Sequence, residues 1–473
     1  MTARQLPPGF INQMKSYGND TVVDSLLHAL SQTAPSLAIR TNSIKGIGTA
    51  GGTPVAWLAN GIYLDERPLF AADPAWHQGL YYVQDASSMA MTAIVEDLCA
   101  KYFNNEPVRY LDCCAAPGGK TIAAIEGLPA GSAVLANEYD RRRAAALAEN
   151  TAKHGYPSIA ISCADGASLG KLGPIFDIVA VDAPCSGEGM MRKEPEAVNQ
   201  WSESLVKSCA ATQRDIIAGV WQALRPGGIL IYSTCTFNRL EDEENAEWIV
   251  NELGCESLSL VCADFDGVVP GFDTKLHCYR FMPGHVRGEG LFIAAFRKPE
   301  GDARAPKMKF KAPKADAAAA AFVKAHIKNA GDYSLLADGD LYSIVPSGEA
   351  PFFVYLAASL RLMRCGLPVC LAKGRDMVPA WELAFSTALD TDSFARLPLA
   401  YSAALSYLHG NSLTDLPDSL PKGFALATYK GLPLGFIKNI GRRANNLYPE
   451  ALRLRINPAE SPDTSFPLLN LPR

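Results

Sequence analysis

The middle of the sequence predicts a doubly wound α/β fold, in which a mostly parallel sheet carries helices on both faces. Residues 99–299 alternate between apolar runs of strand length and longer segments with helical periodicity, which is the pattern of a parallel sheet with crossover helices. A polar or cysteine-containing cluster also follows each expected strand. Because ligands bind beyond the carboxyl ends of the strands in such sheets, these clusters predict an active site at that edge.

The expected strands are short and apolar, and each is followed by a turn or a loop. They comprise residues 109–111, 133–137, 159–162, 176–181 and 229–232. A short helix is expected to end at Glu126, and Asp140 is a favourable N-cap for a helix that runs to His154 and stops at Gly155. A long helix is expected over residues 199–224, ending at the sequence RPGG.

The segments on either side of this alternation predict further domains. At roughly 150 residues per domain, a chain of 473 residues suggests about three. The N-terminal segment is mixed, with a helix expected near residues 20–31 and a strand at 37–40. A run of prolines among lysines indicates an extended basic linker, and the C-terminal part has many short strand-like pieces. The expected division is residues 1–98, 99–299, 300–320, 321–400 and 401–473.

Composition excludes several classes of protein. Hydrophobic residues make up 48% of the chain and charged residues 20%, which is typical of a globular protein and excludes a mostly disordered one. No apolar run approaches the roughly 18 residues of a membrane span, and the N-terminus lacks the apolar core of a secretion signal. The twelve cysteines form no CxxC pair and no zinc-type cluster. We therefore expect a reduced, cytosolic protein that needs neither a membrane nor a metal.

Charge is unevenly distributed along the chain. The net charge is −5, whereas a compact nucleic-acid binder is usually basic. However, residues 238–266 hold nine acids and one base, residues 297–328 hold nine bases and three acids, and residues 428–473 hold seven bases and three acids. Local basic patches can bind nucleic acid despite a negative total, and solvated faces of opposite sign explain the same pattern equally well.

Three short motifs resemble known sites but fail on their context. The sequence GGKT at residues 118–121 lacks the glycine that a P-loop needs six positions before its lysine, because Cys114 stands there. Residues 46–51 match GxGxxG, but a glycine and a proline follow instead of a helix, so we interpret them as a loop. Around Ser186, Pro184 replaces the first glycine of a hydrolase GxSxG elbow.

The loop after the first strand and the acids after the next two predict a nucleotide-like ligand. Small loop residues allow a ligand to approach the backbone, and the following helix N-terminus favours a carboxylate or phosphate. Glu138 can accept hydrogen bonds from ribose hydroxyls or be an ordinary acid at a helix start. Asp165 can contact an adenine amino group or be a simple turn aspartate. The loop consists of Cys114, Ala115, Ala116, Pro117, Gly118, Gly119 and Lys120.

Two cysteines follow the fourth and fifth strands. Asp182 and Cys185 lie in the sequence DAPC, and Cys235 lies in STCT. Either cysteine alone is most simply explained as a small buried hydrophobe. Two thiols at neighbouring strand ends, each flanked by polar residues, favour a reactive site instead. A Cys/His protease is a weak alternative, because no histidine is near in the sequence.

Taken together, the motifs LDCCAAPGGKT, ANEYDRRR, DAPCSGEG and YSTCT resemble the Sun-type (NSUN-like) family of RNA cytosine-5 methyltransferases in order and spacing. QDASSM at residues 84–89 and RFMPGHVRGEGLFIAAFRK resemble further family motifs. The chain length and the terminal stretch GLPLGFIKN…YP resemble the bacterial RsmF-type branch. The resemblance implies a Rossmann-like class I methyltransferase core over residues 99–299, an RNA-binding-like α+β domain over 1–98 and a PUA-like RNA-binding domain over 401–473.

The resemblance also implies roles for the site residues. S-adenosylmethionine would lie over residues 114–120, with Glu138 on its ribose, Asp165 near its adenine and Asp182 between the cofactor and the target base. Cys235 resembles the family nucleophile that adds to carbon 6 of cytosine.

Further residues are implied in the later steps. Cys185 resembles the second cysteine, which assists product release. Asp182, if protonated, could donate to ring nitrogen 3. Lys193 resembles a family position near the site, and a surface lysine is an equally good interpretation. Which group lowers the pKa of the nucleophile is not evident from the sequence.

The expected function is methylation of carbon 5 of a cytosine in RNA. The resemblance to the RsmF-type branch implies 16S rRNA as the substrate, and we expect it within the small ribosomal subunit, because an acidic protein suits an assembled particle better than naked RNA. We expect a monomer in the cytoplasm. The alternatives are a tRNA cytosine-5 methyltransferase, a catalytically idle ribosome assembly factor and a methyltransferase for small molecules or proteins. The idle fold would need neither thiol, and the last class would need neither the paired thiols nor a basic C-terminal domain.

Overall fold

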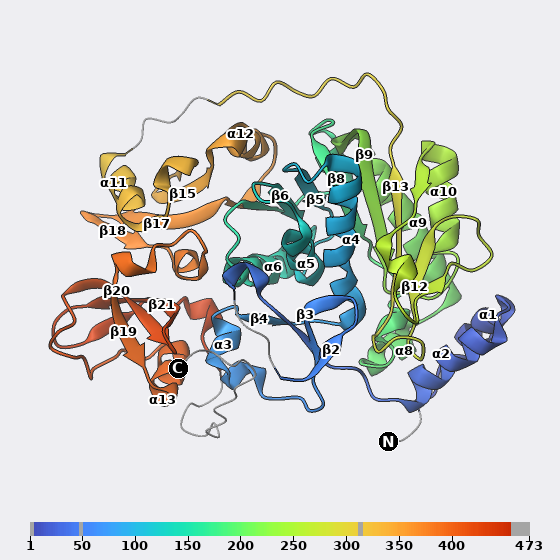
Figure 1. Cartoon of the computed structure of the whole chain (residues 1–473), viewed down its shortest axis with the longest axis horizontal. Helices are drawn as coiled ribbons and strands as arrows, with labels where there is room; N and C mark the ends of the chain where they lie inside the picture. Colours follow the sequence, from blue (N-terminus) through green and yellow to red (C-terminus); the bar gives the residue numbers. More distant parts are fainter. Residues whose placement is uncertain (1–3, 47–50, 311–315, 456–473) are drawn as a thin grey trace.

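The computed structural model describes residues 4–46, 51–310 and 316–455. A large central sheet is flanked by an N-terminal sheet and by two smaller C-terminal sheets (Figure 1). Among the described residues, no helix is both long and apolar enough to cross a membrane. The predicted doubly wound fold is confirmed in the central part.

The central sheet has five parallel strands in its middle, and all five were predicted. They are β5 (Arg109–Asp112), β6 (Ala133–Asn137), β7 (Ile159–Ser162), β8 (Phe176–Asp182) and β9 (Leu224–Thr234). Their order in space is β9-β8-β5-β6-β7, so the chain reverses direction across the sheet between β8 and β5. Antiparallel strands extend the sheet beyond β9, namely β10 (Glu256–Leu258), β11 (Val269–Pro270), β12 (Cys278–Phe281) and β13 (Leu291–Arg297).

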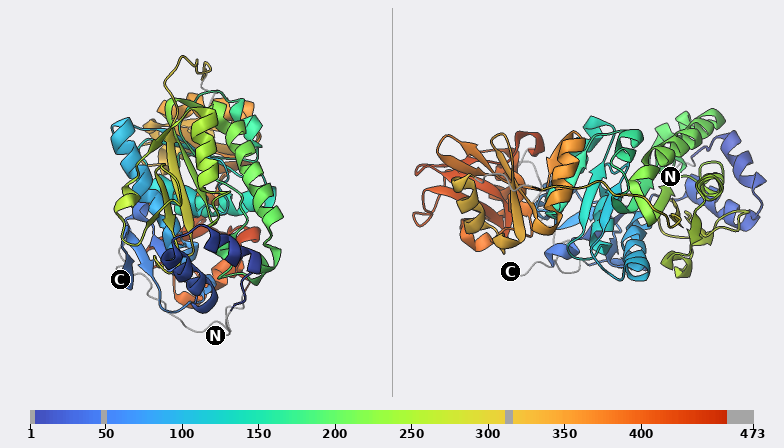
Figure 2. Two further views of the ribbon diagram at one scale, coloured as in Figure 1. Left: turned by 90° about the vertical axis from the view of Figure 1, so that its right-hand side faces the viewer. Right: turned by 90° about the horizontal axis from the view of Figure 1, so that it is seen from above.

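Helices cover both faces of this sheet, and an apolar core lies on each side (Figure 2). One core contains residues of α4 (Ala86–Phe103), α5 (Gly119–Gly127) and α6 (Arg141–His154). The other contains residues of α7 (Gly166–Gly170), α9 (Glu203–Val220), α10 (Glu243–Leu253) and α12 (Ala350–Ser359). The predicted helix that starts after Asp140 and stops at Gly155 is confirmed, because Asp140 caps α6 and Gly155 ends it with φ 92°.

The long helix predicted over residues 199–224 is wrong in its extent. The chain instead forms α8 (Pro195–Gln200), then a break, and then α9. Ser202 causes the break because its hydroxyl accepts a hydrogen bond from the backbone of Leu205 (3.1 Å) and starts a new helix. The RPGG sequence does not end a helix, since it lies inside β9, where the backbone of Gly228 accepts a hydrogen bond from that of Lys298 (2.8 Å).

The central sheet also receives elements from beyond residue 299, the predicted end of the core. Strand β16 (Leu362–Cys365) pairs antiparallel with β7 and forms an edge of the central sheet. Helix α12 packs on a face of the same sheet, where the ring of Phe352 meets that of Phe176 edge-on with centroids 5.8 Å apart. The choice of a strand's partner is a long-range property that local periodicity does not reveal.

Two small sheets make up the rest of the C-terminal part, and α11 and α13 pack with them. The first contains β14 (Tyr333–Asp338), β15 (Leu341–Pro346), β17 (Leu367–Lys373) and β18 (Asp376–Pro379). The second contains β19 (Ala395–Leu399), β20 (Gly423–Tyr429), β21 (Leu432–Asn439) and β22 (Ala444–Asn446). The helices are α11 (Ala317–His326) and α13 (Tyr401–His409).

Two predicted boundaries in this region need correction. Strand β19 pairs in parallel with β20, so the last sheet begins before the predicted boundary at residue 400. Helix α11 begins inside the segment predicted as linker, because Asp316 caps it by accepting hydrogen bonds from two backbone amides. Residues 301–310 have no regular structure. Parts of the expected linker, of the last domain and of the loop at 46–51 lie outside the described residues.

The N-terminal part contains two separate units. Helices α1 (Pro8–Ser16) and α2 (Asp20–Gln32) pack beside Trp201 and Phe237 of the central part. The antiparallel sheet consists of β1 (Ala38–Thr41), β2 (Thr53–Val55), β3 (Leu58–Tyr63) and β4 (Tyr81–Val83), with α3 (Pro74–His77) beside it. The predicted helix at 20–31 and strand at 37–40 are confirmed within one residue. Helix α4 begins at Ala86, before the predicted boundary at 98, and packs in the central core.

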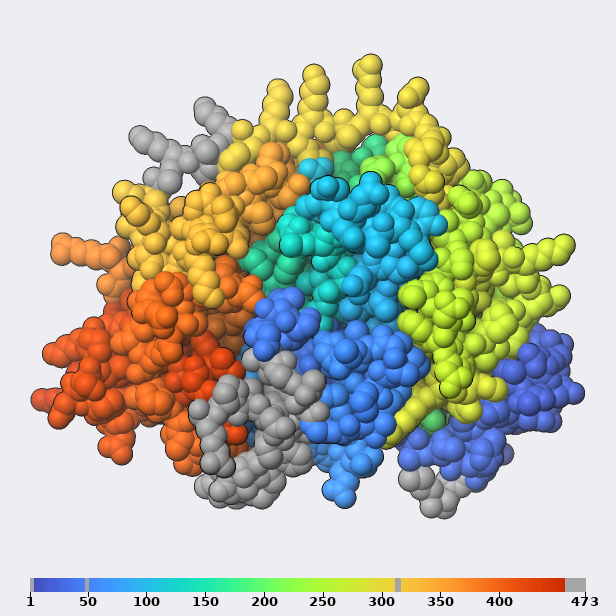
Figure 3. Space-filling view, viewed as in Figure 1, coloured from blue at the N-terminus to red at the C-terminus, as the bar shows by residue number. Residues whose placement is uncertain are grey.

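On the face shown in Figure 3, the N-terminal sheet lies between the central and the C-terminal parts. Gln78 Nε2 donates to the backbone oxygens of Tyr429 (3.1 Å) and Leu432 (2.8 Å). The hydroxyl of Tyr401 donates to the backbone oxygen of Ala72 (2.9 Å). The N-terminal part therefore contacts the last domain directly, and the C-terminal part in turn contacts the central sheet.

We expect the substitution Phe352→Ala to destabilise the catalytic sheet although it lies in the C-terminal region. Removing a fully buried phenylalanine costs about 3–5 kcal/mol, and Phe352 is fully buried against that sheet. Hydrogen exchange should become faster in β7 and β8. Leu408→Ala, which removes a fully buried side chain from the core of the last domain, is the matched control. Faster exchange confined to residues after 320 in the Phe352 variant would contradict the integrated fold.

Candidate functional site

The loop predicted to bind a cofactor lies between β5 and α5, at the carboxyl edge of the parallel strands. Gly118 has φ 112°, which favours glycine, and α5 starts directly after it. Side chains of α6 hold the loop from outside: Arg143 Nη2 donates to the oxygen of Ala116 (2.9 Å) and Asn150 Nδ2 to that of Pro117 (2.8 Å). These two hydrogen bonds fix the loop against α6, and the first backbone amides of α5 have no acceptor within the helix.

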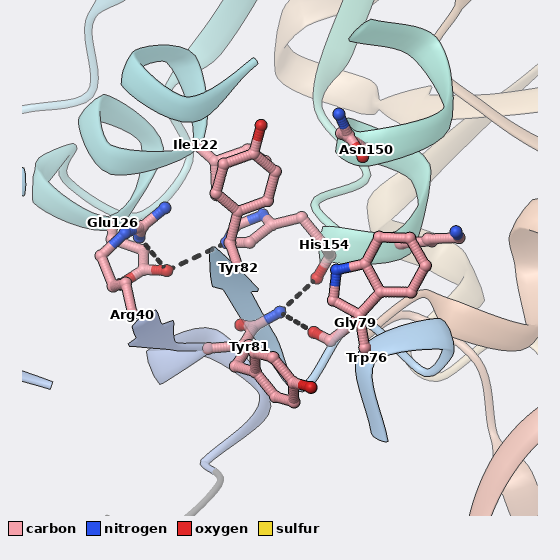
Figure 4. Close-up of a pocket in the computed structure, with 11 residues that line it drawn as sticks. Arg40, Trp76, Gly79, Tyr81, Tyr82, Ile122, Glu126, Asn150 and His154 are labelled. Carbon is pink, nitrogen blue, oxygen red and sulfur yellow. Dashed lines mark hydrogen bonds and ion pairs between the residues drawn. The ribbon is translucent and has the colours of Figure 1, made fainter. Parts of the chain in front are cut away.

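The N-terminal sheet holds this loop from the other side through a buried arginine. Arg40 forms an ion pair with Glu126 near the end of α5, and its Nε donates to Oε1 of Gln84 (2.9 Å). Nε2 of Gln84 in turn donates to the backbone oxygen of Gly119 (3.0 Å). In Figure 4, Arg40 and Glu126 point toward one another, and His154 Nε2 lies 3.2 Å from Glu126. Both ends of α5 are thus positioned by residues outside the catalytic core.

Glu138 lies at the next strand end and has an unused acceptor. The residue is 4% exposed, and its Oε1 accepts a hydrogen bond from the backbone of Asp140 (3.0 Å). Its Oε2 accepts none from any described residue, and Arg143 Nη1 lies 3.4 Å away. A buried carboxylate oxygen without a donor suits a hydroxyl group of a ligand. Asp165 caps α7 by accepting a hydrogen bond from the backbone of Ser168 (2.7 Å), which is the turn role that the sequence also allowed.

The two predicted thiols meet at the ends of β8 and β9. The Sγ atoms of Cys185 and Cys235 are 3.0 Å apart. The pairing of β8 with β9 places Asp182 directly opposite Ser233, whose hydroxyl donates to Asp182 Oδ1 (2.9 Å). Asp182 Oδ2 accepts a hydrogen bond from Lys120 Nζ (2.9 Å). The loop lysine, the acid and both thiols therefore form one cluster, as the sequence predicted from the strand ends.

The cluster explains how a thiolate forms in a buried place. The hydrogen bond between the two cysteines lowers the pKa of Cys235, and the charge of Lys120 acts in the same direction against the effect of burial. The same hydrogen bond, together with burial, raises the pKa of Cys185 well above its usual range. Burial alone would lower the pKa of Lys120, but the negative charges of Asp182 and Cys235 raise it. The surroundings therefore favour the thiolate form of Cys235 over that of Cys185.

Two buried carboxyl groups hold the thiol loops together, and the sequence interpretation missed both. Glu188 accepts hydrogen bonds from the backbone of Phe237 (2.7 Å) and from Trp201 Nε1 (2.9 Å). Glu241 Oε2 accepts from the backbone of Ser186 (3.0 Å). Each residue thus joins the loop after β8 to the loop after β9. Burial raises the pKa of Glu188 to about 7 and also raises that of Glu241. The sequence did hold a signal for both residues, because Glu188 stands in the motif DAPCSGEG and Glu241 stands shortly after YSTCT.

Lys193 lies on the wall of a cleft beside this cluster. The cleft has a volume of about 970 Å³ and separates the N-terminal sheet from the loop after β8. Burial raises the pKa of Asp85 in the same cleft, and the charge of Lys193 opposes that rise. Asp85 in turn acts electrostatically on Lys120. Lys193 is therefore connected to the site through Asp85, while Arg67 and Arg287 add positive charge to the cleft.

Within the described ranges, no group of three or more histidine, cysteine or acidic side chains is arranged to hold a metal ion. All twelve cysteines are free thiols. Of the predicted site residues, the structure brings together Lys120, Asp182, Cys185 and Cys235, and it places Glu138 along the same sheet edge.

Comparison with known proteins gives a consistent result over most of the chain. Three family models match: the N-terminal domain of 16S rRNA methyltransferase RsmF over residues 6–86, 16S rRNA methyltransferase RsmB/F over residues 101–297, and the methyltransferase RsmF PUA domain over residues 394–454.

Two curated relatives are similar over nearly their full length. Ribosomal RNA small subunit methyltransferase F of Enterobacter sp. (strain 638) is 34% identical, with 85% of this chain and 84% of the relative covered. The protein of the same name from Escherichia coli O139:H28 is 31% identical, with 94% and 96% covered. The solved structure of NSun6 from Pyrococcus horikoshii with SFG has a TM-score of 0.51 at 20% identity, covers 62% of this chain and 99% of its own, and supports the fold.

The substitution Lys120→Met should raise the pKa of Cys235, because a positive charge that favours the thiolate is removed. At neutral pH a smaller thiolate fraction remains, so we expect roughly tenfold slower alkylation of Cys235 by iodoacetamide. The pH dependence of the rate, followed by mass spectrometry of the peptide that contains Cys235, should shift to higher pH. Cys185→Ala should shift it in the same direction. Lys171→Met, at an exposed lysine, is the control; an unchanged pH profile in Lys120→Met would refute this electrostatic role.

Proposed function

The chain belongs to the ribosomal RNA small subunit methyltransferase F family, and from this premise we propose that it methylates carbon 5 of a cytosine in 16S rRNA through a covalent adduct on Cys235. It is an RNA methyltransferase that uses S-adenosylmethionine. The observation that carries the catalytic proposal is the 3.0 Å contact between the thiols of Cys185 and Cys235, next to the Lys120–Asp182 ion pair.

The paired thiols suit a base that must first be activated. Carbon 5 of cytosine is a poor nucleophile. The Cys235 thiolate adds to carbon 6, so that an S–C6 bond forms and the electrons of the C5–C6 double bond become available at carbon 5. Lys120 and the Cys185 thiol stabilise the thiolate before attack. The proposed donation from Asp182 to ring nitrogen 3 requires a proton on this carboxyl group, which accepts hydrogen bonds from Lys120 and Ser233.

The second half of the reaction returns Cys235 to its starting state. After carbon 5 has gained the methyl group, a base must remove the proton from that carbon. The C5–C6 double bond then re-forms, the S–C6 bond breaks and Cys235 leaves as a thiolate. Cys185 is the nearest thiol to this leaving sulfur, at 3.0 Å, and is able to protonate or hydrogen-bond it. We therefore propose that Cys185 assists product release.

The residues of the site fit S-adenosylmethionine. The buried, unused Oε2 of Glu138 suits a ribose hydroxyl, and the fixed loop over residues 114–120 leaves the start of α5 open to a carboxylate. We place Asp165 and Asp182 at the adenine and methyl ends of the same site. When bound, this cofactor supplies an electrophilic methyl group on its sulfonium.

We further propose that the target strand enters through the cleft that contains Lys193, Arg67 and Arg287. A base must leave its stack to reach a buried thiolate, and cations along the entrance can hold the phosphates on either side. The last domain is the second proposed RNA contact. Because the whole chain is acidic, we propose the assembled small subunit in the cytoplasm as its target and a monomer as the active form.

The substitution Cys185→Ala should trap the proposed adduct. The variant is incubated with S-adenosylmethionine and RNA or small subunits from cells that lack this protein, at alkaline pH so that the thiolate still forms. We expect a denaturant-stable protein–RNA band, and sequencing of the trapped RNA should identify one cytosine in 16S rRNA.

The adduct must be absent from the double variant Cys185→Ala/Cys235→Ala and from Cys235→Ala. Cys209→Ala, which removes another half-buried thiol, should behave like the unmodified protein. A band that persists without Cys235 would exclude the proposed nucleophile. If tRNA were trapped instead, the proposed rRNA substrate would be wrong. If no RNA formed an adduct although the cofactor bound, a catalytically inactive methyltransferase fold would be favoured.

The substitution Glu138→Gln should weaken cofactor binding, because a charged acceptor for ribose hydroxyls is lost. A hydrogen bond to a charged group contributes about 1.5–3 kcal/mol, so the Kd for S-adenosylhomocysteine should rise by roughly ten- to a hundredfold. Isothermal titration calorimetry measures it directly. Glu149→Gln, in the middle of α6, is the control, and an unchanged Kd in Glu138→Gln would contradict the assigned ribose contact.

A further inference from the structure

The edge strand from the C-terminal region is bulged at one residue. In the pairing of β16 with β7, Leu362 lies opposite Ser162 and Arg364 lies opposite Ile161, so Met363 is the extra residue between two consecutive partners. A bulge of this kind redirects a side chain and is frequent next to active sites. Arg364 fixes the strand, because its guanidinium donates to the backbone of Ala148 (3.0 Å) and to Thr151 (2.8 Å) on α6.

The redirected side chain reaches the end of β7. The sulfur of Met363 lies 3.2 Å from Sγ of Cys163, the residue directly after β7. Cys163 begins the loop that continues to Asp165, and the loop backbone is tied to Asn137 by the hydrogen bond from Asn137 Nδ2 to the oxygen of Ala164 (2.9 Å). Met363 therefore stands beside the loop that joins the two acids proposed to face the nucleoside.

Two exposed apolar side chains border this place. Tyr139 is 76% exposed and Met363 42% exposed, and they are two of only four large hydrophobic residues that are exposed in the described part of the chain. Tyr139 follows Glu138, and the charges of Glu138 and of Arg141 both act on the pKa of Cys163, so this turn lies close to the same thiol. Isolated exposed apolar side chains need no explanation, but two beside one pair of acids suggest a ligand that covers them.

The chemistry of this group matches a purine nucleoside. A purine offers two apolar faces and an amino group at its edge, and its ribose offers hydroxyl donors. Glu138 supplies the buried acceptor for hydroxyl groups, Asp165 supplies a carboxylate at the outer end, and a tyrosine ring and a thioether supply contact for the faces. Methionine sulfur makes favourable contacts with aromatic rings and adapts its shape to them.

We propose that Met363, contributed by the C-terminal region through the bulge in β16, forms an apolar wall of the adenine end of the cofactor site. The inference rests on the proposed placement of S-adenosylmethionine along Glu138 and Asp165. It adds Met363 to the residues proposed to contact the cofactor, although Met363 lies outside residues 99–299, where the cofactor motifs stand. The contact is possible because β16 forms the edge of the central sheet beside β7, and Figure 2 shows the orange C-terminal part of the chain next to that sheet.

The test measures binding to the full-length protein without catalysis. Isothermal titration calorimetry with S-adenosylhomocysteine and with 5′-methylthioadenosine, which keeps the adenosine but lacks the amino acid, compares the unmodified protein with Met363→Ala. Losing part of an apolar contact should weaken both ligands by the same factor, ~5- to 10-fold. Met363→Leu, which keeps most of the apolar volume, should stay within ~2-fold of the unmodified protein.

Two controls separate this role from a structural one. Ile440→Ala truncates another exposed apolar side chain, 47% exposed, at the end of β21 and should leave both affinities unchanged. The thermal midpoint of Met363→Ala without ligand should match that of the unmodified protein, since the side chain is exposed.

The remaining outcomes overturn the proposal in distinguishable ways. Unchanged affinities in Met363→Ala would leave Met363 as a lining residue of the neighbouring cleft of about 500 Å³. Weakened binding in step with a lowered thermal midpoint would assign it a structural role. An unmodified protein that binds neither ligand would remove the proposed function and this inference with it.

Discussion

The parallel pairing of β8 with β9 is the constraint on which the site depends. The register sets Asp182 opposite Ser233, so the residues that follow each strand leave the sheet side by side. The chain then needs only three residues after Asp182 and two after Ser233 to bring two thiols within 3.0 Å. A shift of this register by one residue would turn the flanking side chains to the other face of the sheet and separate the thiols.

A second constraint is electrostatic, because acidic side chains are buried beside the two thiols. Glu188 and Glu241 are fully buried, and each accepts several hydrogen bonds that tie the two thiol loops together. If these buried carboxyl groups lost their hydrogen-bond donors, the loss of folding free energy would exceed what the hydrogen bonds themselves contribute. Lys120 is the positive charge between Asp182 and Cys235. The hydrogen bond with Cys185 and the charge of Lys120 lower the pKa of Cys235, whereas burial and the charges of Asp182 and Glu241 raise it.

The catalytic sheet depends on the parts of the chain before and after it. The N-terminal sheet holds α5 through Arg40 and Gln84, and the C-terminal region adds β16 and α12 to the sheet itself. The hydrogen bond from Gln78 to the backbone of Tyr429 also joins the N-terminal part directly to the last domain.

The sequence alone determined the five parallel strands, the helix between Asp140 and Gly155 and the strand-end positions of Cys185, Cys235 and Glu138. These features depend on local periodicity, on caps and on motif spacing, all of which are encoded within a few residues of each other. Only the tertiary structure decided that Ser202 splits a long helix, that β16 pairs with β7, that Glu188 and Glu241 join the thiol loops, and that the surroundings of Cys235 lower its pKa. These features depend on which distant segments meet and on how deeply charges are buried, and neither is a local property of the chain.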